Sequence, residues 1–406
     1  MDVLERGHYK IRGPGKLRLE DCNVDIMGIP CSGECIFVIP AGRTYLFRVD
    51  GNSCTYSASP IEAEVRRDKL GELLYYNRDK ILSKLKNSDY DGIVFIGPPD
   101  SFKSTISILV FNSILSSNAS SRNKNKTYYI TTDVGQNEIF MPTFISGTSS
   151  YILPGNQIDD TTNCFTGITS PAFDAEKYLW CIAHLINQLR SDKNQLFVVD
   201  TDGWVFGHRA IYSKMMIAEL FDNPLIVYTS LDKEFKKHLL YHFSDLMEYA
   251  VPKEVASTKK PSERRVHRSR LVLKAFKDPY RIVLDFNESN ILGLPVFHGS
   301  EVDPSIFGVP GIIYAEKWKG KIIVVVENKF SYKQKGVEIL KKNWEQGLIT
   351  ALYNNGKISG IGLVEKIDYR KKKLSLIINK GVSFDYIEVG RASFPEVLKS
   401  LESSLH

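Results

Sequence analysis

Short apolar runs alternate with turn residues through the first part of the chain, and this pattern predicts a small antiparallel β domain. Beyond it, apolar runs of four or five residues alternate with longer segments of helical periodicity. Such alternation predicts strands and helices in turn, wound around a mainly parallel sheet. Short strands return near the end and predict a second β domain. We therefore expect three domains, in residues 1–66, 67–281 and 282–406.

The middle domain is the part whose elements the pattern predicts in most detail. Four apolar runs predict buried strands, at 93–96, 128–130, 196–199 and 225–228. Four periodic segments predict helices, at 104–115, 175–189, 212–220 and 233–247. A polar helix is expected at 68–87, ahead of the first of these strands. A strongly basic segment, about 253–277, follows the series and precedes the last domain.

The first strand of the middle domain leads into a loop whose residue types suit phosphate binding. The sequence from Gly92 to Thr105 is GIVFIGPPDSFKST: an apolar strand, a loop and the start of an apolar helix. In a phosphate-binding loop, backbone N–H groups surround the phosphates, a lysine contacts the outer ones, and the next hydroxyl holds Mg²⁺. The sequence therefore predicts that ATP and Mg²⁺ bind at Gly97, Asp100, Ser101, Lys103, Ser104 and Thr105.

Phe102 departs from this pattern, because the residue before the lysine should be glycine. Glycine lets the backbone approach the phosphates, and it adopts dihedral angles that a bulky residue disfavours. If Phe102 keeps those angles, the strain costs about 1–3 kcal/mol. Otherwise the loop opens and loses contacts to phosphate. Descent from a nucleotide-binding loop and competence to bind ATP are thus two separate predictions.

Three other positions in the middle domain have a chemical and a structural interpretation. Asp133 follows a strand end, where an acid can hold Mg²⁺ or its water, or can cap a turn. Ser170 precedes Pro171 and alone predicts a helix start near Ala172. Trp204, flanked by glycine and aspartate after the strand at 196–199, could stack on a nucleobase or pack in the core.

The basic segment also has two interpretations. Arg264 and Arg268 are four residues apart, so a helix would present them on one face. Such a run of charges is usually a solvated surface. Beside a phosphate site, however, arginines can close over a transferring phosphoryl group and balance its charge.

Composition indicates the class of protein, the charge of its partners and its cellular location. The chain has 406 residues, 43% hydrophobic and 25% charged, as in ordinary globular proteins of two or three domains. Its net charge of +6 mildly favours an anionic partner. No apolar stretch approaches the roughly 20 residues of a membrane span, and the start does not resemble a signal peptide, so we expect no membrane partner and a cytoplasmic location, or a nuclear one in a eukaryote. The six scattered cysteines predict free thiols.

In their order along the chain, these segments resemble the polynucleotide 5′-hydroxyl kinase family. Its members include the kinase-like subunit of the messenger-RNA cleavage machinery, ribosomal-RNA-processing kinases and archaeal RNA kinases. The resemblance covers nearly the whole chain. The phosphate loop matches at 97–105, an Asp-x-Asp-x-Gly-Gln motif at 131–136, a Thr-Ser-Pro clasp at 169–171 and an Asn-Thr-x-Gly-Trp motif at 200–204. The arginine lid of the family resembles Lys259, Arg264 and Arg268.

The resemblance implies a fold, an activity and a set of site residues. The fold is α/β, with a P-loop NTPase-type, mainly parallel sheet flanked by small N-terminal and C-terminal β domains. The activity is ATP-dependent phosphorylation of RNA 5′-hydroxyl ends, and potentially of DNA ends, in RNA processing, with other RNA-processing proteins as partners. The implied catalytic residues are Lys103, Asp133, Arg264 and Arg268. Ser104 and Asp133 are implied to bind the metal. The residues implied to bind the RNA end are Gln136, Thr169, Ser170 and Trp204.

Five positions depart from the family pattern. Phe102 replaces glycine, Thr131 replaces the first aspartate of the acidic pair, Asp200 replaces asparagine, Arg209 replaces a glycine and Lys259 replaces an arginine. The first two fall on the catalytic centre and leave two functions open. One is an active kinase in which Asp133 acts as the base. The other is a degenerate homologue that serves as a nucleotide-binding or RNA-binding scaffold. An unrelated P-loop NTPase is a third alternative, but it leaves the clasp and tryptophan motifs unexplained.

Overall fold

The computed structural model describes residues 2–59, 65–86, 88–120, 126–191, 195–251, 260–308, 310–327 and 336–405. Its internal contacts divide the chain into two compact units. The first comprises Met1–Thr166 and Ser170–Pro261, and the second comprises Gly167–Thr169 and Ser262–His406. The N-terminal β strands and the P-loop region thus share one unit. Nearly all of the basic helix that we placed at the end of the middle domain is grouped with the C-terminal β strands.

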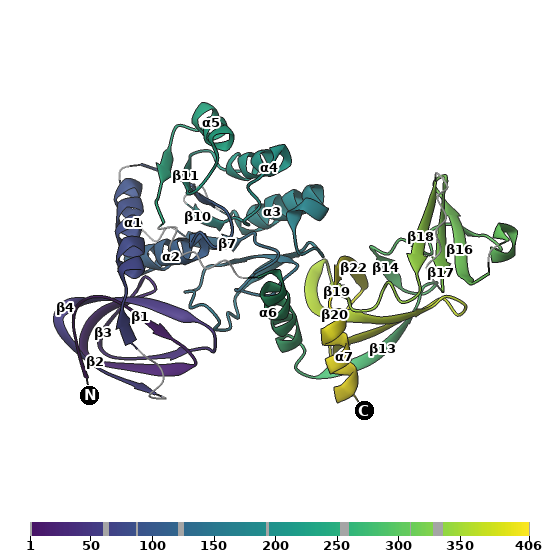
Figure 1. The fold of residues 1–406 in the computed structure, drawn as a ribbon, viewed down its shortest axis with the longest axis horizontal. Helices are drawn as coiled ribbons and strands as arrows, with labels where there is room; N and C mark the ends of the chain where they lie inside the picture. Colours follow the sequence, from purple (N-terminus) through teal and green to yellow (C-terminus); the bar gives the residue numbers. More distant parts are fainter. Residues whose placement is uncertain are drawn as a thin grey trace. The chain divides into compact units, whose positions relative to one another are not determined.

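The first unit begins with a five-stranded antiparallel sheet, drawn in purple in Figure 1, as the apolar pattern predicts. Its strand order is β3-β2-β4-β1-β5. The strands are β1 (Asp2–Arg12), β2 (Gly15–Ile26), β3 (Ile29–Ile39), β4 (Thr44–Ser59) and β5 (Val65–Arg67). Helix α1 (Lys69–Leu85) follows, and its first turn is capped by Asp68, whose carboxylate accepts a 2.8 Å hydrogen bond from the Gly71 N–H.

A seven-stranded sheet forms the centre of the unit, in the order β12-β11-β6-β10-β7-β8-β9. The first five of these strands are parallel, and β8 and β9 add antiparallel pairs at one edge, which confirms the mainly parallel sheet. The strands are β6 (Gly92–Ile96), β7 (Lys126–Thr131), β8 (Phe144–Thr148), β9 (Thr162–Phe165), β10 (Gln195–Asp200), β11 (Pro224–Tyr228) and β12 (Leu246–Glu248).

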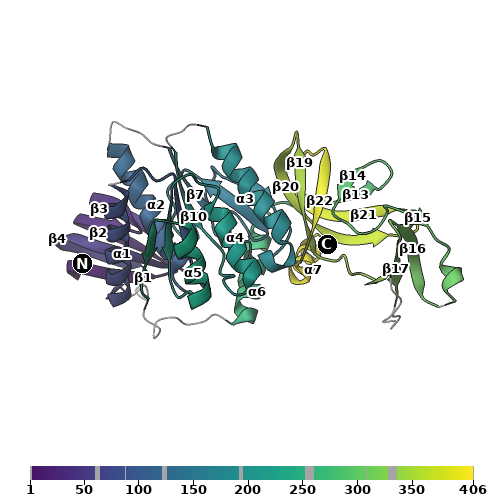
Figure 2. The same cartoon turned by 90° about the horizontal axis from the view of Figure 1, so that it is seen from above.

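Helices alternate with these strands and cover both faces of the sheet. They are α2 (Lys103–Ser120), the short 3₁₀ helix η1 (Pro171–Phe173), α3 (Ala175–Leu189), α4 (His208–Ala218) and α5 (Lys233–His242). Figure 2 shows α2 on one side of β7 and β10, with α3 and α4 on the other. Because β10 lies between β6 and β7, the carboxyl ends of these three parallel strands meet at one edge, where ligands bind in open α/β sheets.

Helix α2 joins the central sheet to the N-terminal sheet. It contacts β6, β7 and β10 as well as β3, so every side chain from Ile106 to Phe111 is buried. Asn112 extends this contact with a polar anchor: its side-chain amide donates to the carbonyls of Met27 at 2.7 Å and Ile152 at 2.8 Å. The start of α2, which carries Lys103, is therefore held by packing along most of the helix.

The second unit contains helix α6 (Pro261–Lys274), two sheets and the C-terminal helix α7 (Pro395–Ser404). One sheet has the order β13-β21-β20-β19-β22-β14, with β13 (Pro279–Asp285), β14 (Asn290–Leu292), β19 (Leu348–Asn354), β20 (Lys357–Asp368), β21 (Lys373–Asn379) and β22 (Tyr386–Ser393). The other has the order β15-β16-β17-β18, with β15 (Ser300–Glu301), β16 (Ile312–Trp318), β17 (Lys321–Val326) and β18 (Val337–Lys341). The predicted C-terminal β structure is confirmed.

Several element boundaries differ from the sequence prediction for local reasons. Helix α3 begins at Ala175 with Asp174 as its cap, whereas Ser170 only precedes the 3₁₀ turn and makes no side-chain capping bond there. The predicted helix at 233–247 ends at His242, and the strand β12 follows. Helix α7 was not predicted. Among the described residues, no helix has both the length and the apolar character needed to cross a membrane.

The cysteines contradict the prediction of free thiols. All six lie in pairs: Cys22 with Cys54, Cys31 with Cys35, and Cys164 with Cys181. The Cα atoms of the pairs are 4.7, 6.4 and 5.6 Å apart, within the range of disulfide geometry. Cys22 and Cys54 come from strands β2 and β4, and Cys164 and Cys181 from strand β9 and helix α3, so spacing along the sequence gives no sign of these two pairings, whereas Cys31 and Cys35 lie in the same strand, β3.

We predict that the oxidised protein has no free thiol. Titration with a thiol reagent in denaturant should detect none before reduction and six afterwards, because each sulfur has a bonding partner within the fold. Six reactive thiols in protein that was purified without a reductant would contradict the pairing.

Candidate functional site

Gly97 ends strand β6 in a turn that leaves no room for a side chain. A Cβ atom at this position would lie 2.9 Å from both Ser101 Oγ and Thr229 Cγ2. The Ser101 hydroxyl donates to the Pro98 carbonyl at 2.7 Å and closes the loop on itself. The Tyr249 hydroxyl donates to the Ser101 carbonyl at 3.3 Å. These contacts hold the loop between β6 and α2 in the compact form that a phosphate cradle needs.

Phe102 has a backbone conformation that is typical of glycine. Its φ is +58°, and that of Asp100 is +60°, so both residues occupy the left-handed region that favours glycine. The strain in a bulky residue there is about 1–3 kcal/mol. The Phe102 ring is half-buried and packs against the hydrophobic core of the unit. That packing offsets part of the strain, and the loop stays closed.

Lys103 is directed into the protein at the first position of α2. Its side chain is buried, with 5% of the residue exposed, and its Nζ lies 3.2 Å from Asp200 Oδ1 at the end of β10. Burial alone would lower the pKa of Lys103, but the carboxylates of Asp200 and Asp133 outweigh it and raise the pKa overall. The lysine is therefore a charged group held at the carboxyl edge of the sheet.

A second buried ion pair lies beside the first. Lys214, on α4, is fully buried and pairs with Asp202 Oδ2. The same oxygen accepts a 2.5 Å hydrogen bond from the Tyr178 hydroxyl, while Asp202 Oδ1 accepts one of 2.7 Å from the Trp204 N–H. Burial, together with repulsion from Lys103, lowers the pKa of Lys214 against the pull of Asp202. Asp202 thus fixes the loop that carries Trp204.

Asp133 completes the group of acids at this edge. Its Oδ1 accepts 2.9 Å hydrogen bonds from the N–H groups of Gly135 and Gln136, so the capped-turn interpretation is correct in geometry. Burial raises the pKa of Asp133; Lys103 opposes this shift, and the carboxylates of Asp202 and Asp200 add to it. The site therefore holds three carboxylates, those of Asp133, Asp200 and Asp202, and two lysines, Lys103 and Lys214.

The other residues expected at the nucleotide and the RNA are distributed over both units. Ser104 is exposed in the first turn of α2, and Thr105, Gln136, Ser170 and Trp204 are half-buried in the first unit. Arg264 and Arg268 are both half-buried on α6 in the second unit, and Thr169 is also grouped there. Lys259 lies outside the described residues. The structure thus brings together Lys103 and Asp133, while the roles of the lid and the clasp stay predictions.

Sequence reasoning missed three participants: Asp202, Tyr178 and Lys214. Lys214 does carry a signal, because a lysine among Ile211, Met215 and Ala218 on a buried helical face is expensive without a partner. Its partner could not be identified from spacing, since Asp202 precedes the helix in another element. Asp200 was noted only as a departure from asparagine, yet it is the acid that contacts Lys103.

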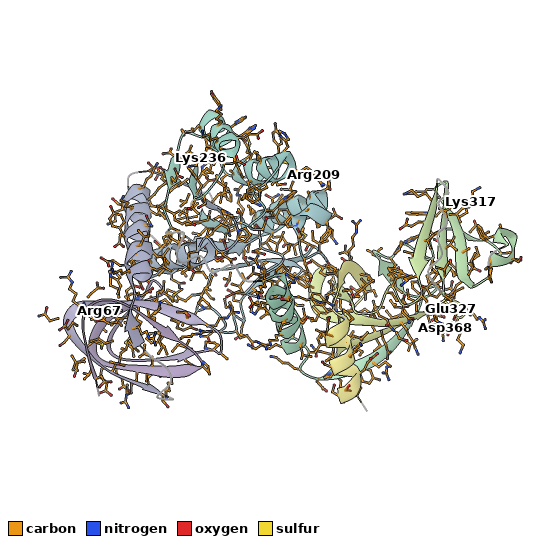
Figure 3. The ribbon with its side chains drawn as sticks, viewed as in Figure 1. Arg67, Arg209, Lys236, Lys317, Glu327 and Asp368 are labelled. Atoms are coloured by element: carbon orange, nitrogen blue, oxygen red, sulfur yellow. A yellow bond between two sulfur atoms is a disulfide. The ribbon has the colours of Figure 1, made fainter. Side chains whose placement is uncertain are left out.

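Exposed aromatic rings lie at the same edge. Phe173 and Phe206 are each 67% exposed, and each stands shortly before a helix, α3 or α4. The starts of these helices are neighbours, because Arg209 Nη2 lies 3.8 Å from Glu176 Oε1; Figure 3 labels Arg209 there. Exposed rings beside a charged site are suited to stacking on unpaired bases.

The donor set at this edge fits a magnesium ion that arrives with a nucleotide. Within the described ranges, no group of three or more His, Cys, Asp and Glu side chains is arranged to hold a metal. Mg²⁺ bound with a nucleotide needs only one or two protein carboxylates, because phosphates and water supply the rest. The Ser104 hydroxyl and the carboxylates of Asp133 and Asp200 are hard oxygen donors of this kind. Burial is the main cause of the raised pKa of Asp133, and the neighbouring carboxylates of Asp202 and Asp200 add to it.

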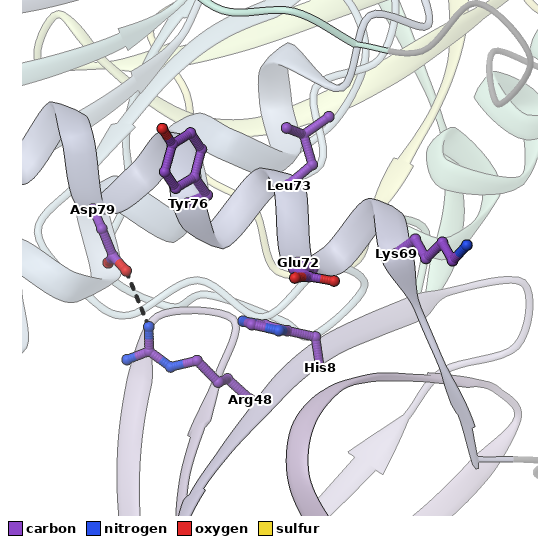
Figure 4. Close-up of a pocket in the computed structure, with 7 residues that line it drawn as sticks. All are labelled: His8, Arg48, Lys69, Glu72, Leu73, Tyr76 and Asp79. Atoms are coloured by element: carbon purple, nitrogen blue, oxygen red, sulfur yellow. Dashed lines mark hydrogen bonds and ion pairs between the residues drawn. The ribbon is translucent and has the colours of Figure 1, made fainter.

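A separate pocket of about 420 Å³ lies between α1 and the N-terminal sheet. It is lined by His8, Arg48, Lys69, Glu72, Leu73, Tyr76 and Asp79, as Figure 4 shows. Arg48 forms ion pairs with Asp79 at 3.1 Å and with Asp50 at 2.7 Å. Burial and Arg48 lower the pKa of His8, so this histidine adds little positive charge. None of the lining residues belongs to the phosphate loop or to the strand ends around Lys103.

Comparisons with known proteins agree with this geometry. Residues 97–277 match the family model of the mRNA cleavage and polyadenylation factor CLP1 P-loop. A wild-type Clp1p–Pcf11p complex is similar over 97% of this chain and 97% of that chain, with a TM-score of 0.63 and 15% identity. A second Pcf11p–Clp1p structure concerns an extended interface and the structural basis for ATP loss in a glycine-to-arginine mutant. It covers 97% of this chain and 98% of that chain, again with a TM-score of 0.63 and 15% identity.

No curated protein matches the chain. At 15% identity, the likeness to the two solved structures is one of fold. The family model and the fold together confirm the family resemblance and the P-loop architecture with flanking β structure.

We predict that Phe102→Gly is more stable to unfolding than Phe102→Ala by about 1 kcal/mol, since alanine retains a Cβ in the left-handed region and glycine does not. Both variants lose the same ring contacts with the core, so alanine is the matched control. Chemical denaturation of the two proteins measures the difference. Equal stabilities would mean that the loop does not hold residue 102 at φ +58° in solution.

Proposed function

Residues 97–277 carry a P-loop domain of the CLP1 family, and from this premise we propose that the chain is an ATP-dependent kinase of RNA 5′-hydroxyl ends. The observation that carries the proposal is the position of Lys103. It begins the helix after a closed phosphate loop and is directed toward the strand ends, 3.2 Å from Asp200. A lysine at this position can bind the outer phosphates of a nucleotide that occupies the loop.

In the proposed mechanism, the chain positions two substrates and balances charge. Lys103 binds the outer phosphates of ATP, while Ser104 and Asp133 hold Mg²⁺ directly or through water. When bound, Mg²⁺ neutralises charge on the phosphates. Arg264 and Arg268 add positive charge around the transferring group. Such transfers depend mainly on positioning and electrostatics, so the absence of an acid at Thr131 does not by itself prevent the reaction.

The RNA end would lie over the aromatic edge of the site. Gln136, Thr169 and Ser170 are proposed to hold the terminal nucleotide, with Trp204 stacking on a base. Trp204 is half-buried, and its backbone N–H donates to Asp202 Oδ1, which holds the loop that carries the indole. Binding to other RNA-processing proteins is proposed by analogy with the matched Clp1p, which is bound to Pcf11p.

The second candidate is a scaffold that binds nucleotide or RNA without transferring phosphate. Phe102 favours it, because the chain tolerates a strained bulky residue at a position where catalysis selects glycine. The two candidates differ in one readout. A scaffold leaves the terminal hydroxyl of an RNA unmodified even when ATP and Mg²⁺ are bound.

We predict transfer of labelled phosphate from ATP to a 5′-hydroxyl oligoribonucleotide, with a rate that falls at least about 100-fold in Lys103→Met, the usual scale for the loss of a charge-stabilising group. Removing Lys103 alone leaves Asp200 buried and uncompensated, which destabilises the fold by about 3–5 kcal/mol. The matched control is therefore Lys103→Met with Asp200→Asn, which keeps the local charge balanced. Transfer by the intact chain no faster than by this folded double variant would refute the kinase.

We predict that Trp204→Ala weakens binding of single-stranded RNA by about 1–3 kcal/mol, the usual value of one stacked base, with ATP affinity unchanged. Trp180→Ala is the control, because Trp180 is a 58% exposed indole on α3 that stacks on His184 instead. Fluorescence anisotropy of a labelled 5′-hydroxyl oligonucleotide measures both. Equal affinities for the two variants would remove Trp204 from the RNA site.

A further inference from the structure

We propose that Asp200 is the carboxylate that faces Mg²⁺–ATP in this chain, in place of an acid at position 131; this inference rests on the proposed function. Thr131 and Asp200 are register partners at the carboxyl ends of the parallel strands β7 and β10. Neighbouring strands lie about 4.8 Å apart. Asp200 therefore lies one strand away from position 131, at the same edge of the sheet. Thr131 is buried and brings no charge.

Strand β10 is the closer of the two strands to the phosphate loop. It pairs directly with β6, the strand that leads into the loop, whereas β7 lies on the far side of β10. Asp200 is 2% exposed, and its Oδ1 is 3.2 Å from Lys103 Nζ. The acid at the end of β10 therefore already faces the group expected to bind phosphate.

An exchange of cations follows from this contact. A buried carboxylate is tolerated only while an opposite charge compensates it, and Lys103 is that charge in the free protein. When Lys103 leaves Asp200 for the phosphates, Asp200 needs another cation. Asp200 would then pair with a Mg²⁺ ion bound together with the nucleotide. Ser104, one residue after Lys103, adds a hydroxyl oxygen to the same set of donors.

Neither neighbouring acid replaces an acid at 131: Asp202 is fully engaged, and Asp133 keeps the metal role proposed above. Both oxygens of Asp202 are engaged, by Lys214 and the Tyr178 hydroxyl on one side and by the Trp204 N–H on the other. Asp133 uses Oδ1 to hold the N–H groups of Gly135 and Gln136. Asp200 forms its ion pair with Lys103, the residue proposed to move to the phosphates.

The test is a carboxylate swap between register partners, read as nucleotide binding rather than activity. Calorimetry measures ATP affinity with Mg²⁺ and with EDTA for the intact chain, Asp200→Asn, and Asp200→Asn combined with Thr131→Asp. We expect Mg²⁺ to strengthen ATP binding by the intact chain. In Asp200→Asn this gain in affinity should fall about tenfold or more, which corresponds to about 1.4 kcal/mol. Asp200→Asn combined with Thr131→Asp should recover most of the gain. Asp200→Asn combined with Thr131→Asn is the uncharged control and should recover nothing.

The outcomes separate this inference from the proposed function. If the intact chain binds no ATP, the proposed kinase and this inference both fail. If it binds ATP and Asp200→Asn keeps the full gain from Mg²⁺, Asp200 is not the metal-facing acid, while the kinase proposal stands. Should Asp200→Asn fail to fold, Asp200→Glu retains the pairing charge and moves it by one methylene. An Mg²⁺ midpoint for ATP binding that is unchanged in Asp200→Glu would overturn the inference.

Discussion

Two buried lysines and two buried aspartates, with the half-buried Asp133 beside them, set the conditions for the rest of the site at the carboxyl ends of β7 and β10. Charged groups are stable away from water only in compensating sets, so Lys103 with Asp200 and Lys214 with Asp202 have to be kept in register by the surrounding structure. The parallel sheet does this by placing the strand ends side by side. Packing of α2 against two sheets also keeps the pairs in register, because it fixes the position of Lys103 at the start of the helix.

This balance connects the fold to the proposed chemistry. In the free protein, Lys103 is paired with the carboxylate of Asp200. In the proposed mechanism, Lys103 exchanges this carboxylate for the phosphates when the nucleotide binds. The strain at Phe102 does not prevent that exchange, because the residue keeps a glycine-like φ and directs its ring into the core. The chain therefore departs from the family pattern in sequence at 102 but has a glycine-like φ at that position. The departures at 131 and 200 are neighbours, since the two residues are register partners across adjacent strands.

The sequence predicts the architecture well because apolar periodicity reports burial directly. The strands at 93–96 and 196–199 and the helix at 175–189 appear where the pattern places them. Interactions that depend on side chains meeting across elements were not predictable. Lys214 and Asp202 lie on a helix and a loop, and Cys164 pairs with Cys181 between β9 and α3, so no local spacing encodes either pair. Ser170-Pro171 and Asp174 both resemble helix starts: Ser170 precedes only a short 3₁₀ helix, and Asp174 makes the capping bond of α3.

The most direct test of the account is a crystal structure of the chain with Mg²⁺ and a non-hydrolysable ATP analogue. The account predicts triphosphate density along residues 97–105, Lys103 Nζ turned from Asp200 to the outer phosphates, and a metal between the phosphates and the end of β10. Triphosphate bound elsewhere, or Lys103 still paired with Asp200 beside an occupied loop, would contradict it.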